Sequence, residues 1–228
     1  MTRTIDALLH WLKWPVALWV AVGVPQLLRA DLALVQAGLR LELLPFWLGL
    51  VGYLTVWWTV LRHRGWGRLL PTLLHEVTHA LFALLTFHRV VSIHATWSSG
   101  GLMQFLGRGN WLITISPYFF PLAILVAAPF LELLQTAEPV RLALLGVVFG
   151  FESAAMWRQV HRDQPDLQDV GFLFTAVFLP GALLWSYGTV FSLALGGGRG
   201  MTAFVAAQWT AHWRTIGTLL QQGIAAIT

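Results

Sequence analysis

The sequence contains no cysteine, and charged side chains make up only 11% of its 228 residues. Without cysteine the chain forms no disulfide and offers a metal no thiolate, so histidine and carboxylate groups must hold any metal. The charged fraction lies far below the about 25% that is usual in soluble domains. In contrast, 57% of the residues are hydrophobic, and the 13 tryptophans suit the interfaces of a bilayer. The composition therefore indicates an integral membrane protein.

The formal net charge is only +4, and the basic residues stand at the ends of apolar segments rather than in one patch. This scatter argues against a nucleic-acid partner and indicates topology signals and contacts with lipid headgroups. Arg62, Arg64 and Arg68 form the densest basic cluster, and the positive-inside rule places their loop in the cytoplasm. Residues 1–10 lack the pattern of a removable signal peptide, so we expect the first segment to stay as an anchor. The expected location is the cytoplasmic (inner) membrane of a bacterium.

Apolar segments recur along the chain and predict the fold class. We expect an all-α polytopic membrane protein of about six transmembrane helices with both termini in the cytoplasm. The fourth segment contains Pro117, Pro121 and Pro129, which must kink it and free backbone carbonyls. The predicted spans are residues 14–28 with an extension over 5–12, then 43–61, 69–87, 111–131, 142–157 and 170–195.

Two stretches depart from the pattern of spanning helices. Apolar and polar residues alternate over 91–97, and glycine and serine precede the apolar residues 102–106, which predicts a short membrane-associated β-hairpin. An ordinary loop is the alternative for this stretch. After the glycines at 196–198, apolar residues recur at helical spacing and predict an amphipathic C-terminal helix on the membrane surface. We divide the chain into N-terminal spans (1–68), a core (69–195), and a glycine hinge with an interfacial helix (196–228).

An HExxH sequence, His75-Glu76-Val77-Thr78-His79, lies in the third predicted span. Histidines four residues apart share one face of a helix, so both imidazoles can bind one metal ion while Glu76 lies beside it. Such charged and polar groups inside a membrane helix cost several kcal/mol unless the bundle uses them. The motif therefore predicts a Zn²⁺ site with His75 and His79 as ligands and Glu76 as general base. The other histidines stand in loops or at segment ends and are expected to be solvated or interfacial: His63, His88, His94, His161 and His212.

With the HExxH motif in a membrane helix, a following hairpin, and Ser116-Pro117 in the next span, the chain resembles the site-2 protease (M50-type) family of intramembrane zinc metalloproteases. The similarity covers residues 69–195 and implies zinc on His75 and His79, Glu76 as base, and cleavage of membrane-embedded peptide or protein substrates. The family's third ligand is an aspartate in an Asp-Gly motif of a later span. This chain has no Asp-Gly dipeptide, so the third ligand cannot be carried over.

Few acidic residues qualify as the missing ligand. His79 lies about ten residues into its span, or about 15 Å at 1.5 Å per residue, which is near the bilayer midplane. Glu152 lies about ten residues into the fifth span, which runs in the same direction. Depth therefore favours Glu152. Asp166 and Asp169 remain alternatives, and either requires a connector that folds back into the membrane.

The predicted hairpin suggests how an unwound substrate is held. Adding the substrate as a further strand is a common mode of peptide binding, and Ile93, Ala95 and Trp97 are the expected contacts. Two other functions stay open, an inactive regulator with the protease fold and a small transporter or lipid-binding protein. A closed four-ligand metal site favours the first, and the absence of a stoichiometric metal favours the second. The sequence does not indicate the oligomeric state.

Overall fold

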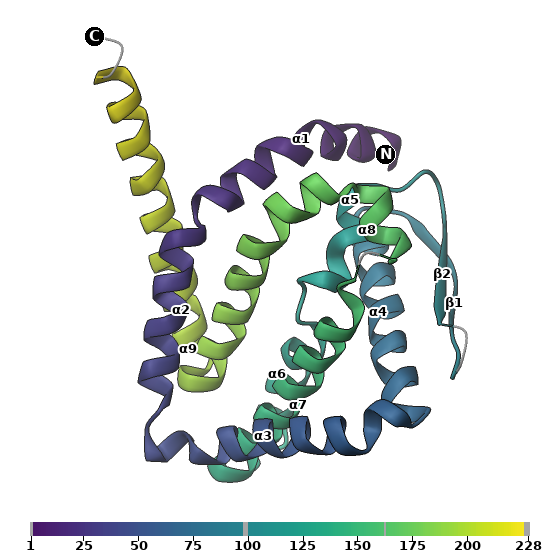
Figure 1. Cartoon of the computed structure of the whole chain (residues 1–228), viewed down its shortest axis with the longest axis vertical. Coiled ribbons are helices and arrows are strands. Elements are labelled where there is room, and N and C mark those ends of the chain that lie inside the picture. Colours follow the sequence, from purple (N-terminus) through teal and green to yellow (C-terminus); the bar gives the residue numbers. More distant parts are fainter. Residues whose placement is uncertain (1, 98–99, 162, 226–228) are drawn as a thin grey trace.

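The computed structural model describes residues 2–97, 100–161 and 163–225. The chain is mainly helical, with one two-stranded antiparallel sheet beside helix α4 (Figure 1). The predicted turn residues Ser98 and Ser99 lie outside the described residues. In chain order the elements are α1 (Thr2–Val22), α2 (Val24–Gly38), η1 (Leu41–Leu43), α3 (Leu44–Thr59), η2 (Leu61–His63), α4 (Trp66–Leu85), β1 (Arg89–Ala95), β2 (Gly101–Leu106), α5 (Trp111–Ile115), η3 (Ser116–Tyr118), α6 (Leu122–Leu133), α7 (Glu138–Gln159), α8 (Pro165–Val170) and α9 (Phe172–Ala225).

By length and hydropathy, four helical segments among the described residues can cross a membrane: Thr2–Val22, Leu41–His63, Glu138–Gln159 and Phe172–Ala225. The broken segment from α5 through α6 bends by 65° and gives a fifth candidate when it counts as one span. Helix α4 was expected to be a span, but its polar face of His75, Glu76 and His79 keeps it out of this set. The chain is an integral membrane protein, but six spans are not confirmed.

Glycine allows helices α3 and α7 to pack in close backbone contact. A side chain at Gly49 would clash with the backbone carbonyl of Ala143, and one at Gly146 would clash with the carbonyl of Phe46. In a bilayer the hydrophobic effect does not drive helices together, and small residues at the contact allow two helix backbones to approach closely. The contact fixes α7 in the bundle and thereby the position of its last residues near α4.

Helix α4 lacks one of its backbone hydrogen bonds, and side chains at the end of α7 bind to its backbone at that point. Pro71 has no N–H, so the carbonyl of Gly67 lacks its usual partner within the helix. The Arg158 guanidinium donates to that carbonyl at 3.0 Å, and Gln159 Nε2 donates to the Pro71 carbonyl at 3.1 Å. The proline therefore frees the carbonyl that Arg158 binds, and the neighbouring Gln159 is held against α4 by the Pro71 carbonyl.

The predicted β-hairpin is confirmed. Strands β1 and β2 pair antiparallel, with Ile93 opposite Met103 and Ala95 opposite Gly101, and both strands contact α4. The chain reaches β1 through a tight turn at the end of α4, where Phe87 adopts a left-handed conformation (φ 62°). In that turn the His88 N–H donates to the Ala83 carbonyl at 2.8 Å, as in a Schellman motif. The hairpin thus lies along α4 (Figure 1).

The C-terminal part of α9 differs from the expected surface helix. The chain bends at Gly196 and Gly197 (φ 59°), and the following helix doubles back so that Phe204 lies beside Gly188. It then runs along α2 (Figure 1). His212 is fully buried there and its Nε2 donates to the Trp19 carbonyl at 2.6 Å. One face of the tail therefore packs on the bundle.

Candidate metal centre

The HExxH residues of α4 lie in the interior, where α4 meets α5 and α8. His75 Nε2 and His79 Nε2 are 3.0 Å apart, and Glu76 and His79 are each only 7% exposed. The spacing of four residues places both rings on one face, as the sequence predicts. Their ring centroids are 4.6 Å apart and the planes are nearly perpendicular, so the two nitrogens point at a common position.

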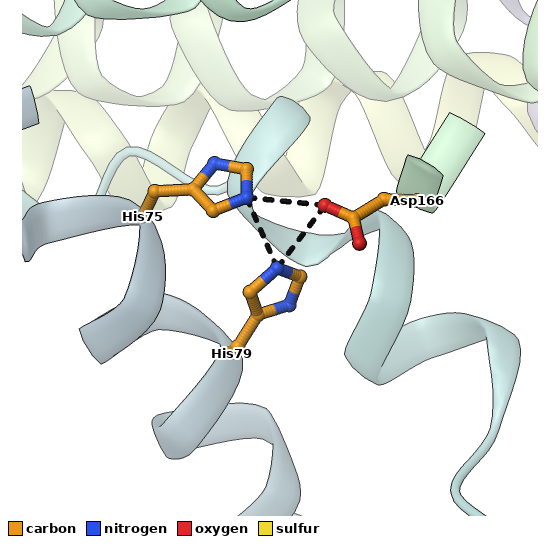
Figure 2. A group of neighbouring side chains, drawn as sticks. All are labelled: His75, His79 and Asp166. Atoms are coloured by element: carbon orange, nitrogen blue, oxygen red, sulfur yellow. Dashed lines mark hydrogen bonds and ion pairs between the residues drawn. The ribbon is translucent and has the colours of Figure 1, made fainter. Parts of the chain in front are cut away.

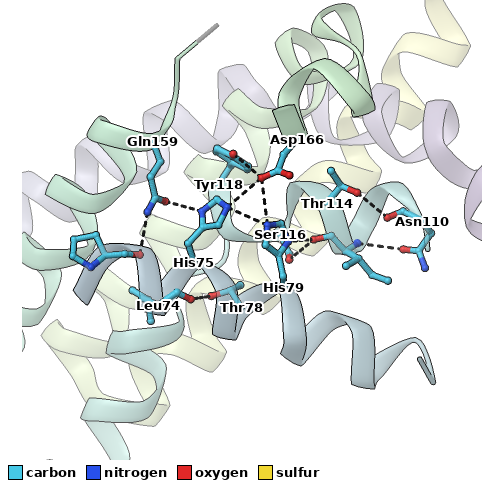
Figure 3. Close-up of polar contacts among 12 residues, drawn as sticks. Leu74, His75, Thr78, His79, Asn110, Thr114, Ser116, Tyr118, Gln159 and Asp166 are labelled. Atoms are coloured by element: carbon cyan, nitrogen blue, oxygen red, sulfur yellow. Dashed lines mark hydrogen bonds and ion pairs between the residues drawn. The ribbon is translucent and has the colours of Figure 1, made fainter. Parts of the chain in front are cut away.

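Hydrogen bonds on the far side of each ring fix its orientation (Figure 3). His79 Nδ1 lies 2.8 Å from the Ile113 carbonyl, and His75 Nδ1 lies 3.0 Å from Gln159 Oε1. The carbonyl can only accept, so His79 donates from Nδ1. The Gln159 amide is itself oriented by its bond to Pro71, so His75 also donates from Nδ1. Both Nε2 atoms therefore keep a free lone pair, as metal-binding histidines do.

A carboxylate completes the group. Asp166 Oδ2 lies 3.1 Å from His75 Nε2 and 3.3 Å from His79 Nε2 (Figure 2). The Tyr118 hydroxyl donates to the same oxygen at 2.9 Å. Burial by itself raises the pKa of the Asp166 carboxyl, but hydrogen bonds from the His75 and His79 rings, in their protonated forms, outweigh that effect and hold its pKa well below the usual range. Asp166 is therefore ionised at neutral pH.

Helix α8 is short, and its two ends explain how Asp166 is held. Pro165 occupies the first helical position, where its missing N–H has no cost. Leu167 and Val170 are buried in the same core cluster as Ile115. Gly171 ends the helix with φ 95°, a conformation that glycine adopts readily. The buried side chains of Leu167 and Val170 hold α8 against the core, and Gly171 ends the helix, so Asp166 faces α4.

The donor set fits a zinc ion. Two acceptor nitrogens and a carboxylate oxygen converge with all three ligand atoms within 4.8 Å of one another, an arrangement that is repulsive without a cation or proton between them. Three ligands at about 2.0–2.1 Å around a tetrahedral ion lie about 3.3 Å apart, close to the 3.0, 3.1 and 3.3 Å found here. His75, His79 and Asp166 are thus the residues that could hold Zn²⁺.

Glu76 points toward strand β2 beside this cluster. The backbone N–H of Met103 donates to its carboxylate. A side chain at Gly101 would clash with the Glu76 carboxylate and with Thr72, so glycine is what lets β2 approach this closely. An open pocket of about 540 Å³ lies between β2, α4 and α8 and is lined by His75, Glu76, His79 and Asp166. The carboxylate therefore borders a space large enough for a peptide segment.

Glu152, the expected third ligand, lies elsewhere. Its Oε1 accepts from the Ala123 N–H at 2.6 Å, and the side chain is 5% exposed. Ala123 is in the first turn of α6, directly after the 65° bend, so Glu152 satisfies helix N–H groups that the break leaves without partners. The depth argument was wrong because α7 ends at Gln159 beside His75, and the chain reaches Asp166 only seven residues later. Asp169, the other alternative, lines the pocket outside the three-residue group.

The expected substrate contacts on β1 also differ from the arrangement found. The pocket is lined by Gly101, Leu102, Met103 and Phe105 of β2 and by none of Ile93, Ala95 and Trp97. Trp97 instead packs edge-on against Trp66, with ring centroids 4.5 Å apart. Of the histidines expected to be solvated, His88 is only 1% exposed and His212 is buried. Alternation places side chains on faces but does not reveal which strand borders the pocket, so substrate contact by Ile93, Ala95 and Trp97 stays a prediction that the pocket lining does not support.

Residues outside the sequence-based prediction contribute to the centre. Tyr118, Gln159 and the carbonyl of Ile113 each contact a member of the group (Figure 3). Tyr118 directly follows the Ser116-Pro117 pair, one of the features on which the resemblance rests, so it could have been found. Gln159 carries no sequence signal, because its role follows from the carbonyl acceptors around Pro71.

Comparison with known proteins agrees with this site. The family model described as Peptidase M50B-like matches residues 47–162. The chain therefore belongs to the M50B-like peptidase family, which confirms the resemblance to site-2 proteases. No curated protein and no solved structure matches. The matched region includes His75, Glu76 and His79 and ends before Asp166.

Proposed function

We propose that this protein is an intramembrane zinc metalloprotease that hydrolyses peptide bonds of membrane-embedded protein or peptide substrates. The observation that carries the proposal is the convergence of His75, His79 and Asp166 on one position with Glu76 beside it. Two histidines and a carboxylate leave a fourth position free, which is the arrangement of catalytic rather than structural zinc. Membership of the peptidase family supports the same class of reaction.

Each residue of the site has a defined task in such a reaction. Zinc, when bound, supplies Lewis-acid activation of water and of the scissile carbonyl. His75, His79 and Asp166 would hold the ion, and Gln159, the Ile113 carbonyl and Tyr118 fix their orientation. Glu76 takes a proton from water as general base and transfers it to the leaving amine. The polar pocket provides a place for water that lipid excludes.

Strand β2 is suited to hold the substrate. Its Gly101 to Phe105 segment faces the pocket next to Glu76. A helical substrate hides its carbonyls in intrahelical bonds and must unwind, and an unwound segment can pair as an added strand with the edge of β2 that borders the pocket, where it would replace the bond from the Met103 N–H to Glu76. This places a backbone carbonyl of the substrate beside the metal position. The cytoplasmic membrane of a bacterium remains the expected location.

The proposal is tested with purified protein and a transmembrane peptide. Wild type should bind one zinc per chain and cleave the peptide. Glu76→Gln should keep its zinc and lose cleavage, because the ligands remain while the base is gone. His75→Ala should lose both. Undiminished cleavage by Glu76→Gln would contradict the assignment of the base, and a chain that binds no metal would favour the transporter alternative.

An inactive regulator with the same fold is the remaining alternative. It requires a fourth protein ligand that closes the metal site. Among the described residues the group of potential ligands has three members, which favours the catalytic function.

A further inference from the structure

A second pocket, here called the side pocket, opens beside the catalytic one. Its volume is about 950 Å³, and it lies between α1, the segment after β2, and α8. Arg108, Thr114 and Asp169 line both pockets, so the two share a wall. The charged and titratable residues that line the side pocket are Arg3, Asp6, His10, Lys13, Arg108 and Asp169.

Basic side chains outnumber carboxylates in this lining, although Asp169 is exposed and Lys13 donates to the Val170 carbonyl at 2.7 Å. Arg3, Lys13 and Arg108 stand against two carboxylates, Asp6 and Asp169. Within residues 2–97, 100–161 and 163–225, no carboxylate oxygen lies within 4.0 Å of the charged nitrogens of the three cations. Arg3 and Arg108 are exposed, so their guanidinium groups are free to bind an anion.

Both oxygens of Asp6 are engaged by other partners, so among the described residues it makes no direct ion pair with the three cations. Its Oδ2 lies 3.1 Å from Nε2 of the buried His88, and its Oδ1 accepts from Asn110 Nδ2 at 2.8 Å. Asn110 Oδ1 in turn accepts from the Ile113 N–H at the start of α5. Asp6 thus ties α1 to the segment that orients His79, and it acts as part of the pocket wall.

The course of β2 connects the side pocket to the expected path of a substrate. The strand passes Glu76 at Gly101 and Met103 and ends at Leu106. The next residues, Gly107, Arg108 and Gly109, line the side pocket. A peptide paired with β2 therefore leaves the catalytic pocket toward Arg108, about five residues or about 17 Å from the position opposite Met103.

We propose that the side pocket binds an acidic side chain of the substrate, about five residues from the scissile bond. This inference rests on the proposed function and adds a substrate class, membrane peptides with a carboxylate on the flank that leaves along β2. Guanidinium groups bind carboxylates through paired hydrogen bonds, and Arg108 at the shared wall is the principal contact. Arg3 on α1 is the second.

The test measures peptide binding rather than cleavage, so the result of the test does not depend on catalysis. The zinc-loaded Glu76→Gln protein is titrated in neutral detergent with fluorescein-labelled peptides of alternating valine and serine that carry a single Asp or Asn at successive positions. The Asp peptide should bind about two- to fivefold tighter than its Asn counterpart. The preference should peak at one position and weaken as salt is raised.

Variants assign the preference to the side pocket. Arg108→Gln and Arg3→Gln should each reduce it, and Arg108→Glu should reverse it in favour of a Lys peptide. Arg199→Gln, which removes an exposed cation in the hinge far along the chain, is the matched control and should leave it unchanged. These are exposed side chains, so the variants should fold.

Two results would overturn the proposal. One is equal binding of Asp and Asn peptides at every position by a protein that holds zinc. The other is a loss of binding to phosphatidylglycerol micelles in Arg108→Gln and Arg3→Gln with no change in peptide preference, which would make a lipid phosphate the ligand. A chain that binds no zinc would instead contradict the proposed function.

Discussion

Asp166 Oδ2 lies 3.1 Å from His75 Nε2, although 91 residues separate them in the chain. Removing that carboxylate should reduce zinc affinity by at least about tenfold to 100-fold, the loss usual even for outer partners of metal ligands. Asp166→Asn should therefore be purified with little zinc, as measured by mass spectrometry of the metal. Glu152→Gln is the matched amide variant and should keep its zinc, because Glu152 contacts Ala123 rather than the histidines. The reverse pattern would restore Glu152 as the ligand.

Gln159 provides a test of the outer partners. Gln159→Ala removes the acceptor for His75 Nδ1 and should weaken zinc binding about 10- to 100-fold in a competition with a chelator. Gln221→Ala changes an exposed residue of the C-terminal helix and serves as control. Equal affinities of the two variants would mean that His75 needs no outer partner.

Gly101 tests the close approach of β2 to Glu76. Gly101→Ala places a methyl group against the Glu76 carboxylate and Thr72, so the strand must move away. We expect at least about a tenfold loss of peptide cleavage, because a displacement of about 1 Å can cost 100-fold. Zinc content should be unchanged. Gly52→Ala on α3 meets no atom within 4 Å and should retain activity. A fully active Gly101→Ala protein would exclude β2 as the substrate strand.

Acid should release the metal. The histidines must be neutral to bind zinc, and an ordinary histidine has a pKa of about 6.5. The pKa of the Asp166 carboxyl is held below its usual range by its contacts with His75 and His79, so this carboxylate stays ionised over the same pH range. Zinc occupancy should therefore fall as the pH decreases from about 7 to about 5. Dialysis at stepped pH with metal analysis measures this, and occupancy that is lost only near pH 3 would point to protonation of Asp166 instead.

Local patterns in the sequence predict the helical class, the hairpin and two ligands of the candidate site. His75 and His79 are set by the period of one helix, and the strands by alternation over a few residues. These features depend on neighbours in the chain, so one sequence is enough to find them. The same motif led us to expect the family, and the match over residues 47–162 confirms it.

The third member of the metal group depends on where separate helices begin and end. The expected fifth span over residues 142–157 implied that Glu152 lies at the depth of His79. Helix α7 begins earlier, at Glu138, and ends beside His75, so that Asp166 reaches the site. Glu152, the acidic residue inside that span, is instead explained by the break before α6, because its carboxylate accepts from the Ala123 N–H there. No pattern in one sequence distinguishes a carboxylate that caps a broken helix from one that binds a metal.

His75 and Asp166 are separated by 91 residues in the sequence, and this separation determines when the candidate metal centre can form during synthesis. Ribosomes add residues from the N-terminus, so a nascent chain displays both histidines and Glu76 well before Asp166 has been made. Such a chain contains two of the three candidate ligands, and the hairpin, the broken α5–α6 segment and α7 are synthesised before the third. The complete group of His75, His79 and Asp166 therefore exists only after most of the bundle has been synthesised, and the hydrolysis proposed for this site could not begin earlier.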